Sequence, residues 1–412
     1  MRKLWIIVIS VLSLLSACGE KDDPLSKDTL PVIRLTTDDG QPVTSKTEYK
    51  PGTIEISDPK HKYWDTETFT AGMEIRGRGN TTWDPENKPK LPYMIKLNES
   101  ARIFGMSFDR SWNLLANWTD KSLLRNRVCF ELSKIVGMSW TPKSVPVEVY
   151  LNGEYIGLYD FIEHKKVSSE RVNINVNAGD FYFEMENNQD NPVCWTTEQG
   201  HPIMFREPEH PSEEQLAYAK QFFKEFEDAL YSGEYQKVYD EYIDMDSFIN
   251  NYLVEEFSKD IDGILRKSTF LTLTNGGKLV MYHLWDFDIT FGNCDYYDDG
   301  LQPWEGWWIR NHNQFGPGRG WYFRLFLDPV FASRVKERWN ELYPEFRALY
   351  DEIDVMVADM GTAPARNFKK WNILNTYVWP NYKVTGSYKG EVDWLKENYL
   401  KRLDWMNTNI NK

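Results

Sequence analysis

Residues 259–288 read KDIDGILRKSTFLTLTNGGKLVMYHLWDFD, and this stretch decides the expected fold. Two runs rich in apolar and β-branched residues flank Asn275-Gly276-Gly277, which is typical of a hairpin turn. Antiparallel pairing across the turn sets Ser268 opposite about Leu284, so both ends of the stretch meet at one end of the ribbon. This register predicts that several carboxylates converge: Asp260, Asp262, Asp286 and Asp288.

Clustered carboxylates of this kind predict a cation site. Like charges repel strongly unless a cation or another positive partner lies between them. Oxygen ligands, to which Ser268 and Asn293 would add, suit Mg²⁺, Mn²⁺ or Ca²⁺ rather than zinc. Two other interpretations stay open: the acids cap helices and turns at a surface, or they form the Asp pair of a glycosidase.

The first half of the chain reads as β-rich. Asn152-Gly153 separates two apolar runs and predicts a second hairpin. Alternating or apolar runs predict further strands. The predicted strands lie at 32–35, 53–56, 73–76, 93–97, 112–116, 145–151 and 155–162.

Helical patterns dominate beyond residue 210. Ser212 and Gln215 form a capping box that opens one helix, and others are predicted at 246–257 and 394–406. In the first half, Thr119 is expected to cap a helix that ends at Gly137. The sequence therefore predicts an α+β protein with a β-rich lobe at 31–165 and a mainly helical lobe at 166–412 that carries the metal hairpin, with a cleft between them.

The first residues predict export. Arg2 and Lys3 precede an apolar run from Leu4 to Ala17, which is too short to span a bilayer and has the charged start of a secretory signal. The small residues before Cys18 resemble the lipobox of bacterial lipoproteins, in which this cysteine carries the lipid. We therefore expect a signal peptide at 1–17, an acidic tether at 18–30, Sec-type export and an outer-membrane or cell-surface lipoprotein held to the membrane by its lipid alone. A plain signal peptide with a chance cysteine is the alternative.

Charge and composition limit the partners. The 412 residues carry 48 Lys and Arg against 62 Asp and Glu, a formal charge of −14, which argues against nucleic acid. Aromatic residues make up 15% of the chain, which suggests a large core or a face that stacks on sugars. The tryptophans considered for such a face are Trp304, Trp307, Trp308 and Trp321, with filling of the core as the alternative.

The cysteines beyond Cys18 predict little chemistry. Cys129 lies in an apolar helical pattern and is expected to be a buried small hydrophobe. Cys194 and Cys294 are a candidate disulfide in an oxidising compartment. No CxxC or His/Cys cluster supports zinc.

Cations that match the carboxylates occur in the β-rich half. Lys96 is a single lysine at the end of an apolar strand, and Arg125 lies in the next helix. The stretch Arg76-Gly77-Arg78-Gly79-Asn80 is glycine-rich and basic, so it can present backbone N–H groups and guanidinium groups to phosphates. An ordinary β-turn is the alternative for this loop.

Several ordered blocks resemble the spore-coat protein H (CotH) kinase family. The blocks are 76–83, 90–97, 112–117, 120–126, 148–159, 259–262 and 285–293, and the helix at 394–405 also resembles the end of that family. The resemblance implies an atypical protein-kinase-like fold that uses ATP with Mg²⁺ or Mn²⁺.

The resemblance also implies roles for single residues. Asp262 would be the catalytic aspartate that orients or deprotonates the acceptor hydroxyl, and Asp286 the aspartate that holds Mg²⁺, with Asp288 and Ser268 beside the metal. Lys96 would bind the ATP phosphates, and Glu163 would lie at the hinge beside the adenine. The residues implied near the phosphates are Arg76, Gly77, Gly79, Asn80 and Arg125.

Two departures from the family pattern stand out. Asp260 occupies a position at which the family commonly has Asn, and Ser268 stands where a second metal ligand is expected. The predicted function is ATP- and Mg²⁺-dependent phosphoryl transfer to Ser or Thr of a secreted or surface protein. The alternative is a catalytically weak, kinase-fold surface lipoprotein that binds glycans or acts in adhesion.

Overall fold

The computed structural model describes residues 30–66, 68–187, 193–263, 265–296, 300–311 and 318–412. The predicted signal peptide, Cys18 and all but the last residue of the predicted tether lie outside the described residues. No helix of the described part is long and apolar enough to cross a membrane.

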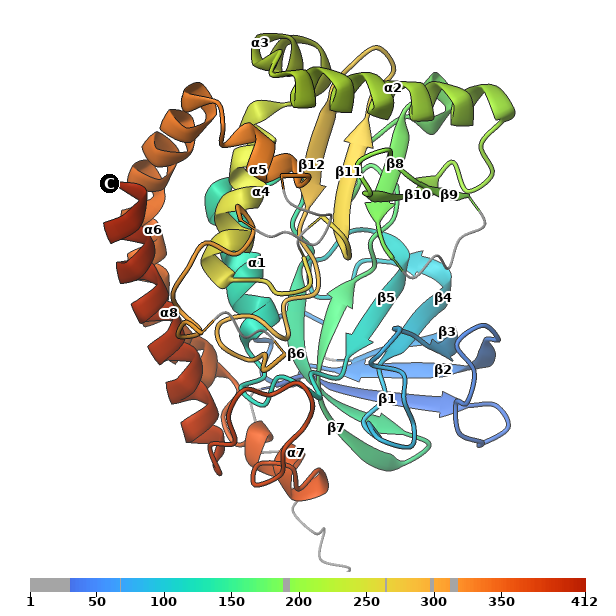
Figure 1. The fold of residues 1–412 in the computed structure, drawn as a ribbon. Helices are drawn as coiled ribbons and strands as arrows, with labels where there is room; N and C mark the ends of the chain where they lie inside the picture. The colour runs from blue at the N-terminus through green and yellow to red at the C-terminus, as the bar shows by residue number, and fades with distance from the viewer. Residues whose placement is uncertain (1–29, 67, 188–192, 264, 297–299, 312–317) are drawn as a thin grey trace, which may run out of the picture.

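A closed barrel forms the first part of the molecule (Figure 1). Its strands, in order around the barrel, are β1 (Val32–Thr37), β2 (Lys50–Ser57), β3 (Thr68–Gly77), β4 (Tyr93–Ala101), β5 (Asp109–Leu115), β7 (Glu154–Glu163) and β6 (Ser144–Leu151). Alternate residues such as Ile33, Ile54 and Ile95 fill its interior and are fully buried. Each such side chain stabilises the fold by about 1.5–3 kcal/mol.

A second sheet lies beyond the barrel. Its strand order is β12 (Leu279–His283), β11 (Thr269–Leu273), β8 (Phe181–Met185), β10 (Pro202–Glu207) and β9 (Cys194–Thr196). The predicted hairpin is confirmed as β11 and β12, in which Phe270 pairs with His283 and a bulge follows. The sheet occupies the part of the chain that the sequence predicts as mainly helical, and the strands β8, β9 and β10 were not predicted.

Helices cover one side of both sheets, and α2 crosses one end of the second sheet (Figure 1). The α-helices are α1 (Arg125–Val136), α2 (Glu213–Ser232), α3 (Tyr235–Lys237), α4 (Met245–Ser258), α5 (Trp321–Leu325), α6 (Pro329–Asp359), α7 (Ala363–Lys370) and α8 (Tyr388–Ile410). Short turns of other helix types are η2 (Val176–Ala178) and η3 (Val238–Tyr242). The mixture of helix and strand is compatible with the predicted α+β class, whereas the boundary between the two predicted lobes stays a prediction.

The start of α1 differs from the prediction. Thr119 does not cap the helix, which begins at Arg125. The N-cap position is Leu124, which makes no side-chain capping hydrogen bond, and the carboxylate of Asp120 accepts the backbone N–H groups of Leu124 and Arg125 at 3.0 and 2.8 Å. Gly137 ends α1 in a left-handed conformation with φ 79°, as predicted.

The other predicted turns are present. The capping box of Ser212 and Gln215 opens α2, with both of its hydrogen bonds formed. Asn152 and Gly153 have φ values of 50° and 81° and turn β6 into β7. Local sequence signals therefore account for how these elements begin and end.

One of the two cysteine predictions is confirmed and the other is wrong. Cys129 is fully buried in α1, as expected for a small hydrophobe. Cys129, Cys194 and Cys294 are all free thiols, so the predicted disulfide between Cys194 and Cys294 is wrong. Cys194 lies on β9, whereas Cys294 packs in a small cluster with Ile261 and Ile289.

The tryptophans considered for a sugar-stacking face pack against the helices instead. Trp321 is fully buried, with its ring 4.9 Å from that of Phe226. Trp304 meets Trp394 edge-on at 6.4 Å, and Trp307 meets Trp405 in the same way at 4.9 Å. The half-buried Trp308 donates its backbone N–H to Glu256 at 2.7 Å. Trp321 is buried in the core and the other three are half-buried, which favours the interpretation of these four as packing residues.

Candidate functional site

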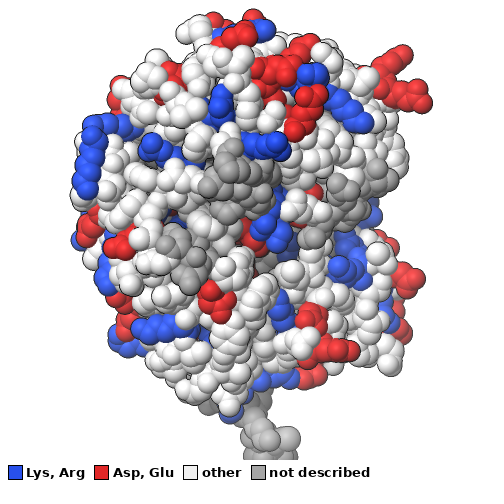
Figure 2. Space-filling view, viewed as in Figure 1, with Lys and Arg blue, Asp and Glu red and all other residues white. Residues whose placement is uncertain are grey.

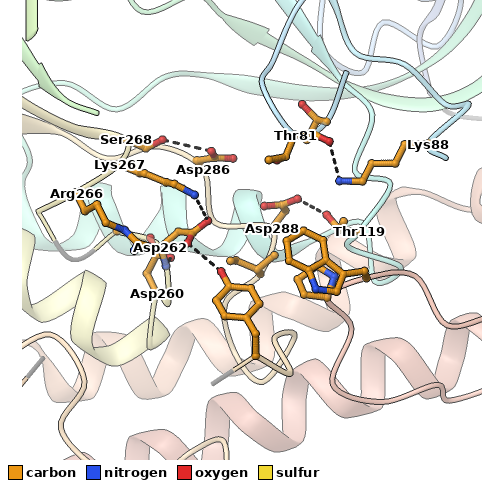
Figure 3. Close-up of a pocket in the computed structure, with 16 residues that line it drawn as sticks. Thr81, Lys88, Thr119, Asp260, Asp262, Arg266, Lys267, Ser268, Asp286 and Asp288 are labelled. Carbon is orange, nitrogen blue, oxygen red and sulfur yellow. Dashed lines mark hydrogen bonds and ion pairs between the residues drawn. The ribbon is translucent and has the colours of Figure 1, made fainter. Parts of the chain in front are cut away.

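The segments just before β11 and just after β12 line one cavity, as the register predicted (Figure 3). Asp260, Asp262 and Ser268 precede β11, while Asp286 and Asp288 follow β12. The opposite wall comes from distant segments: Thr81, Thr82, Lys88, Thr119, Trp379 and Pro380. The cavity has a volume of about 200 Å³ and opens to solvent.

Asp262 is held by three donors. Arg266 Nη2 lies 3.3 Å from its Oδ1, and Lys267 Nζ lies 3.2 Å from its Oδ2. The Tyr296 hydroxyl donates to Oδ1 at 2.9 Å. With a side chain 30% exposed, Asp262 is a carboxylate that can be reached from the cavity and is kept in place by positive charge.

Asp286 and Asp288 form the other acidic side of the cavity. Ser268 donates its hydroxyl to Asp286 Oδ2 at 3.3 Å, and Thr119 donates its hydroxyl to Asp288 Oδ2. Burial and the neighbouring charge of Asp286 raise the pKa of Asp288 to about 7. Burial also raises the pKa of Asp286, against the opposing effect of Arg78. Burial is the larger cause of both shifts, and the charges of the neighbouring carboxylates add to it.

The donor set fits a hard divalent cation. Asp286, Asp288 and Ser268 present only oxygen atoms, which Mg²⁺ and Mn²⁺ prefer. Mg²⁺ usually takes one or two carboxylates and completes its shell with water and phosphate oxygens. Within the described part of the chain no cluster of three or more Asp, Glu, His or Cys side chains is arranged to enclose a metal by itself. The site thus fits a cation whose coordination shell is completed by groups other than these side chains.

A buried carboxyl pair lies beneath the Asp262 loop. Asp260 and Glu255 are 1% and 3% exposed, and burial raises the pKa of both, that of Glu255 to about 7. Asp260 Oδ1 accepts the backbone N–H of Asp262 at 3.1 Å. A Cβ atom at Gly263 would come within 2.4 Å of Oδ2 of Asp260 and Oε2 of Glu255, so a glycine is required there. The pair therefore fixes the backbone that presents Asp262.

Cations gather on the barrel side of Asp286. Arg78 is half-buried and makes no side-chain hydrogen bond or ion pair with any residue that the structure describes, although the charges of Asp286 and Glu184 act on it. Lys165 Nζ lies 2.8 Å from Glu184 Oε1 and 4.0 Å from the centre of the Phe270 ring. Burial alone would raise the pKa of Glu184, but Lys165 and Arg206 lower it overall. Figure 2 shows Lys and Arg side chains around a hollow in the middle of this face.

Comparison with protein families gives one match. The family model described as CotH kinase protein matches residues 75–406. The chain belongs to the CotH kinase family. The match includes every residue that lines the cavity, and a comparison with curated proteins found no match. Family membership suggests a kinase-like enzyme that uses a nucleotide and a divalent metal.

In this CotH family member, the predicted phosphate lysine lies away from the cavity. Lys96 is on the outer face of β4, where Nζ lies 3.9 Å from Glu74 Oε2 and the side chain is 40% exposed. Arg76, on β3, donates to the carbonyl groups of Lys46 and Gly77 at 2.5 and 3.0 Å. Neither residue lines the cavity, so their predicted contact with phosphates stays untested.

The glycine-rich loop is shaped by close packing. A Cβ atom at Gly77 would lie 2.3 Å from the Trp83 ring, and one at Gly79 would lie 2.0 Å from Thr82 Oγ1. Gly79 also has φ 91°, which favours glycine. Asn80 is exposed. The loop leads into Thr81 and Thr82, which line the cavity, but its glycines and Asn80 do not.

Two further predicted residues are buried in hydrogen-bond networks. Glu163 is 1% exposed, and its carboxylate accepts the backbone N–H groups of Ser107 and Lys143 at 2.6 and 2.9 Å. Arg125 is fully buried, pairs with Asp120 at 2.6 Å and donates to the carbonyl of Thr290 at 2.8 Å. Neither side chain lines the cavity.

Several residues of the site were not predicted from the sequence. Arg266, Lys267 and Tyr296 contact Asp262, while Lys165 and Arg206 surround Glu184. Only Arg266 and Lys267 carried a signal, because they lie within five residues of Asp262 and just before a predicted strand. The others come from segments that only the fold brings near.

Proposed function

We propose that this protein is a CotH-type kinase that transfers the γ-phosphoryl group of ATP, with Mg²⁺ or Mn²⁺, to a Ser or Thr hydroxyl of a secreted or surface protein. The observation that carries the proposal is the meeting of Asp262 with Asp286 and Asp288 in one cavity, with the charge of Arg78 acting on Asp286. Phosphoryl transfer needs positioning and charge stabilisation more than covalent chemistry from the protein. This cavity offers both.

Each side of the cavity has a distinct role in this proposal. Asp262 orients the acceptor hydroxyl and accepts its proton, because its oxygens face the cavity and its backbone is fixed by Asp260. Asp286 and Asp288 would hold the divalent cation, which supplies charge neutralisation at the phosphate oxygens. Arg78 and Lys165 lie on the barrel side, where their positive charges act on Asp286, and they supply charge there for phosphates.

The departures from the family pattern fit this arrangement. Asp260 replaces Asn, yet its burial next to Glu255 favours a neutral, shared proton, so it retains an acceptor for the Asp262 N–H group. Ser268 is a weaker ligand than Asn, and Asp288 adds a carboxylate that compensates for it at the metal. We therefore expect turnover to be lower than with Asn at both positions.

The surface location belongs to the same proposal. The charged start, short apolar run and Cys18 support Sec-type export and a lipid at Cys18 as the single membrane attachment. The acceptor would then be another exported protein. The glycan-binding alternative loses its main support, because Trp304, Trp307 and Trp321 pack edge-on or in the core.

Calorimetry with ATP and Mg²⁺ tests the nucleotide site. We expect the wild type to bind Mg-ATP, and Asp286→Ala to weaken the Mg²⁺-dependent part of that affinity by at least tenfold, since it loses a carboxylate at the metal. Asp262→Ala is the matched control, because it should retain nucleotide while losing transfer to a generic protein acceptor. Binding that is absent, or that does not respond to the Asp286 substitution, would refute the proposal.

A further inference from the structure

A phenol occupies the position on Asp262 that an acceptor hydroxyl requires. The Tyr296 hydroxyl donates to Asp262 Oδ1 at 2.9 Å, and both residues line the cavity. A general base acts on a hydroxyl within about 2.6–3.2 Å. Among the contacts that hold Asp262, this is the one made by a group that can itself accept a phosphoryl group.

We propose, resting on the proposed function, that Tyr296 is an intramolecular phosphoacceptor: the protein phosphorylates this tyrosine on itself when Mg-ATP occupies the cavity. The charges of Asp262 and Asp286 act on one another, so the phenol lies in the same small space as the proposed metal. The phenol is therefore already within reach of the base Asp262, and no rearrangement of the chain is needed.

The surroundings of Tyr296 orient its hydroxyl. Its ring stacks on Trp379 with centroids 5.7 Å apart and an angle of 22° between the planes, and its side chain remains 44% exposed. Lys88 Nζ lies 5.6 Å from the centre of the Trp379 ring, which links the stack to the barrel side of the cavity. Burial and the charge of Asp262 raise the pKa of Tyr296, so the phenol keeps its proton until the base removes it.

The chemical step balances with the reactants of the proposed function. Asp262 accepts the phenolic proton of Tyr296, and the phenolic oxygen forms a bond to the γ-phosphorus of ATP. The bond from that phosphorus to the β,γ-bridging oxygen breaks, and ADP leaves with the electron pair. The products are phosphotyrosine 296, a protonated Asp262 that returns its proton to water, and ADP.

Modification of Tyr296 would also change access to Asp262. A phosphotyrosine carries a charge of about −1.5 to −2, which Asp262 and Asp286 repel. The ring would therefore leave Asp262 and free its Oδ1 for an external hydroxyl. Autophosphorylation at this position activates transfer to other acceptors, whereas the unmodified phenol competes with them.

The test is incubation of the chain with ATP and Mg²⁺, followed by peptide mass spectrometry at several protein concentrations. We expect phosphate on Tyr296, formed with a first-order rate constant that does not change with concentration. Tyr296→Phe should abolish this phosphopeptide and, by removing the competing hydroxyl, raise the initial rate on a generic acceptor at least twofold. The matched control is Tyr377→Phe, because Tyr377 is 51% exposed and donates to Asp295 at 2.5 Å, not to Asp262.

The outcomes separate the two proposals. Transfer to a generic acceptor while Tyr296 stays unmodified overturns this inference and leaves the proposed function standing. A rate constant that rises in proportion to protein concentration overturns it too, since transfer would then occur between molecules. Absence of Mg-ATP binding in calorimetry overturns the proposed function itself. Thermal unfolding of each variant confirms that loss of the phosphopeptide is not loss of the fold.

Discussion

Replacing Glu255 by Gln should change how the stability of the protein depends on pH. Glu255 is buried beside Asp260 under the loop that carries Asp262, and its Oε2 atom has no hydrogen-bond partner among the described residues. Two carboxyls this close cannot both be ionised without strong repulsion. Gln keeps the shape of the protonated carboxyl but cannot lose a proton, and its amide can donate to Asp260.

Proton linkage gives the direction and the size of the change in unfolding free energy with pH. Burial raises the pKa of Glu255 from its ordinary 4.5 to about 7, so the folded protein holds a proton that the unfolded chain has released. The contribution to stability is complete below about pH 4.5 and is lost as pH rises through about 7. At about 1.36 kcal/mol per pH unit, the loss over that interval is about 3 kcal/mol. Asp260, whose pKa is also raised, acts in the same direction.

Denaturant unfolding at pH 5 and pH 8 measures this difference. The wild type should lose about 3 kcal/mol of unfolding free energy between the two values beyond any general trend, and Glu255→Gln should lose much less. Glu225→Gln is the control, because Glu225 is exposed on α2 and its variant should follow the wild type. Wild-type and Glu255→Gln curves that run parallel would refute the idea of a shared proton under the loop.

Two further substitutions test where the structure places residues. Arg125→Met should reduce the unfolding free energy by about 3–5 kcal/mol in urea, because it leaves the carboxylate of Asp120 buried without its partner; a folded variant of wild-type stability that has lost only nucleotide affinity would instead indicate a phosphate role. Trp321→Ala should cost about 3–5 kcal/mol by the same measurement. If it were as stable as the wild type and altered only glycan retention on an affinity column, the core assignment of Trp321 would be wrong.

The convergence of the carboxylates could be predicted because it depends on local rules. A turn at Asn275-Gly276-Gly277 and antiparallel pairing are enough to bring Asp262 to Asp286, and the observed bulge shifts the register too little to separate them. The barrel strands were predictable for a similar reason. Their interior side chains alternate with exposed ones, as in β2.

The strands of the second sheet lack that alternation. All residues of β8, from Phe181 to Met185, are buried, so both faces are covered and period two disappears from the sequence. The sequence also could not show whether Lys96 faces the cavity, because that depends on how β4 is oriented relative to the rest of the fold. Lys165 donates to Glu184, which lies 19 residues further along the chain, and no local pattern encodes that contact.

Asp286 and Asp288 are held in place by a hydrogen-bond network that the family resemblance alone does not reveal. Asn126 Oδ1 accepts the backbone N–H of Phe287 at 2.8 Å, between the two aspartates. Arg125 and Asn293 add to this network. Arg125 donates to the Thr290 carbonyl, and Asn293 Nδ2 donates to the Asp288 carbonyl at 2.7 Å.

These contacts prevent Asp286 and Asp288 from moving apart to relieve their repulsion. A loop free to relax would lower its own energy and lose affinity for a cation, whereas this loop keeps the two carboxyls close, so that a proton or a cation must relieve their repulsion. The buried network thus keeps the two carboxyls close together, and their repulsion favours binding of a cation. A variant that loosens the network, such as Asn126→Ala, should weaken metal binding although residue 126 is not one of the proposed ligands.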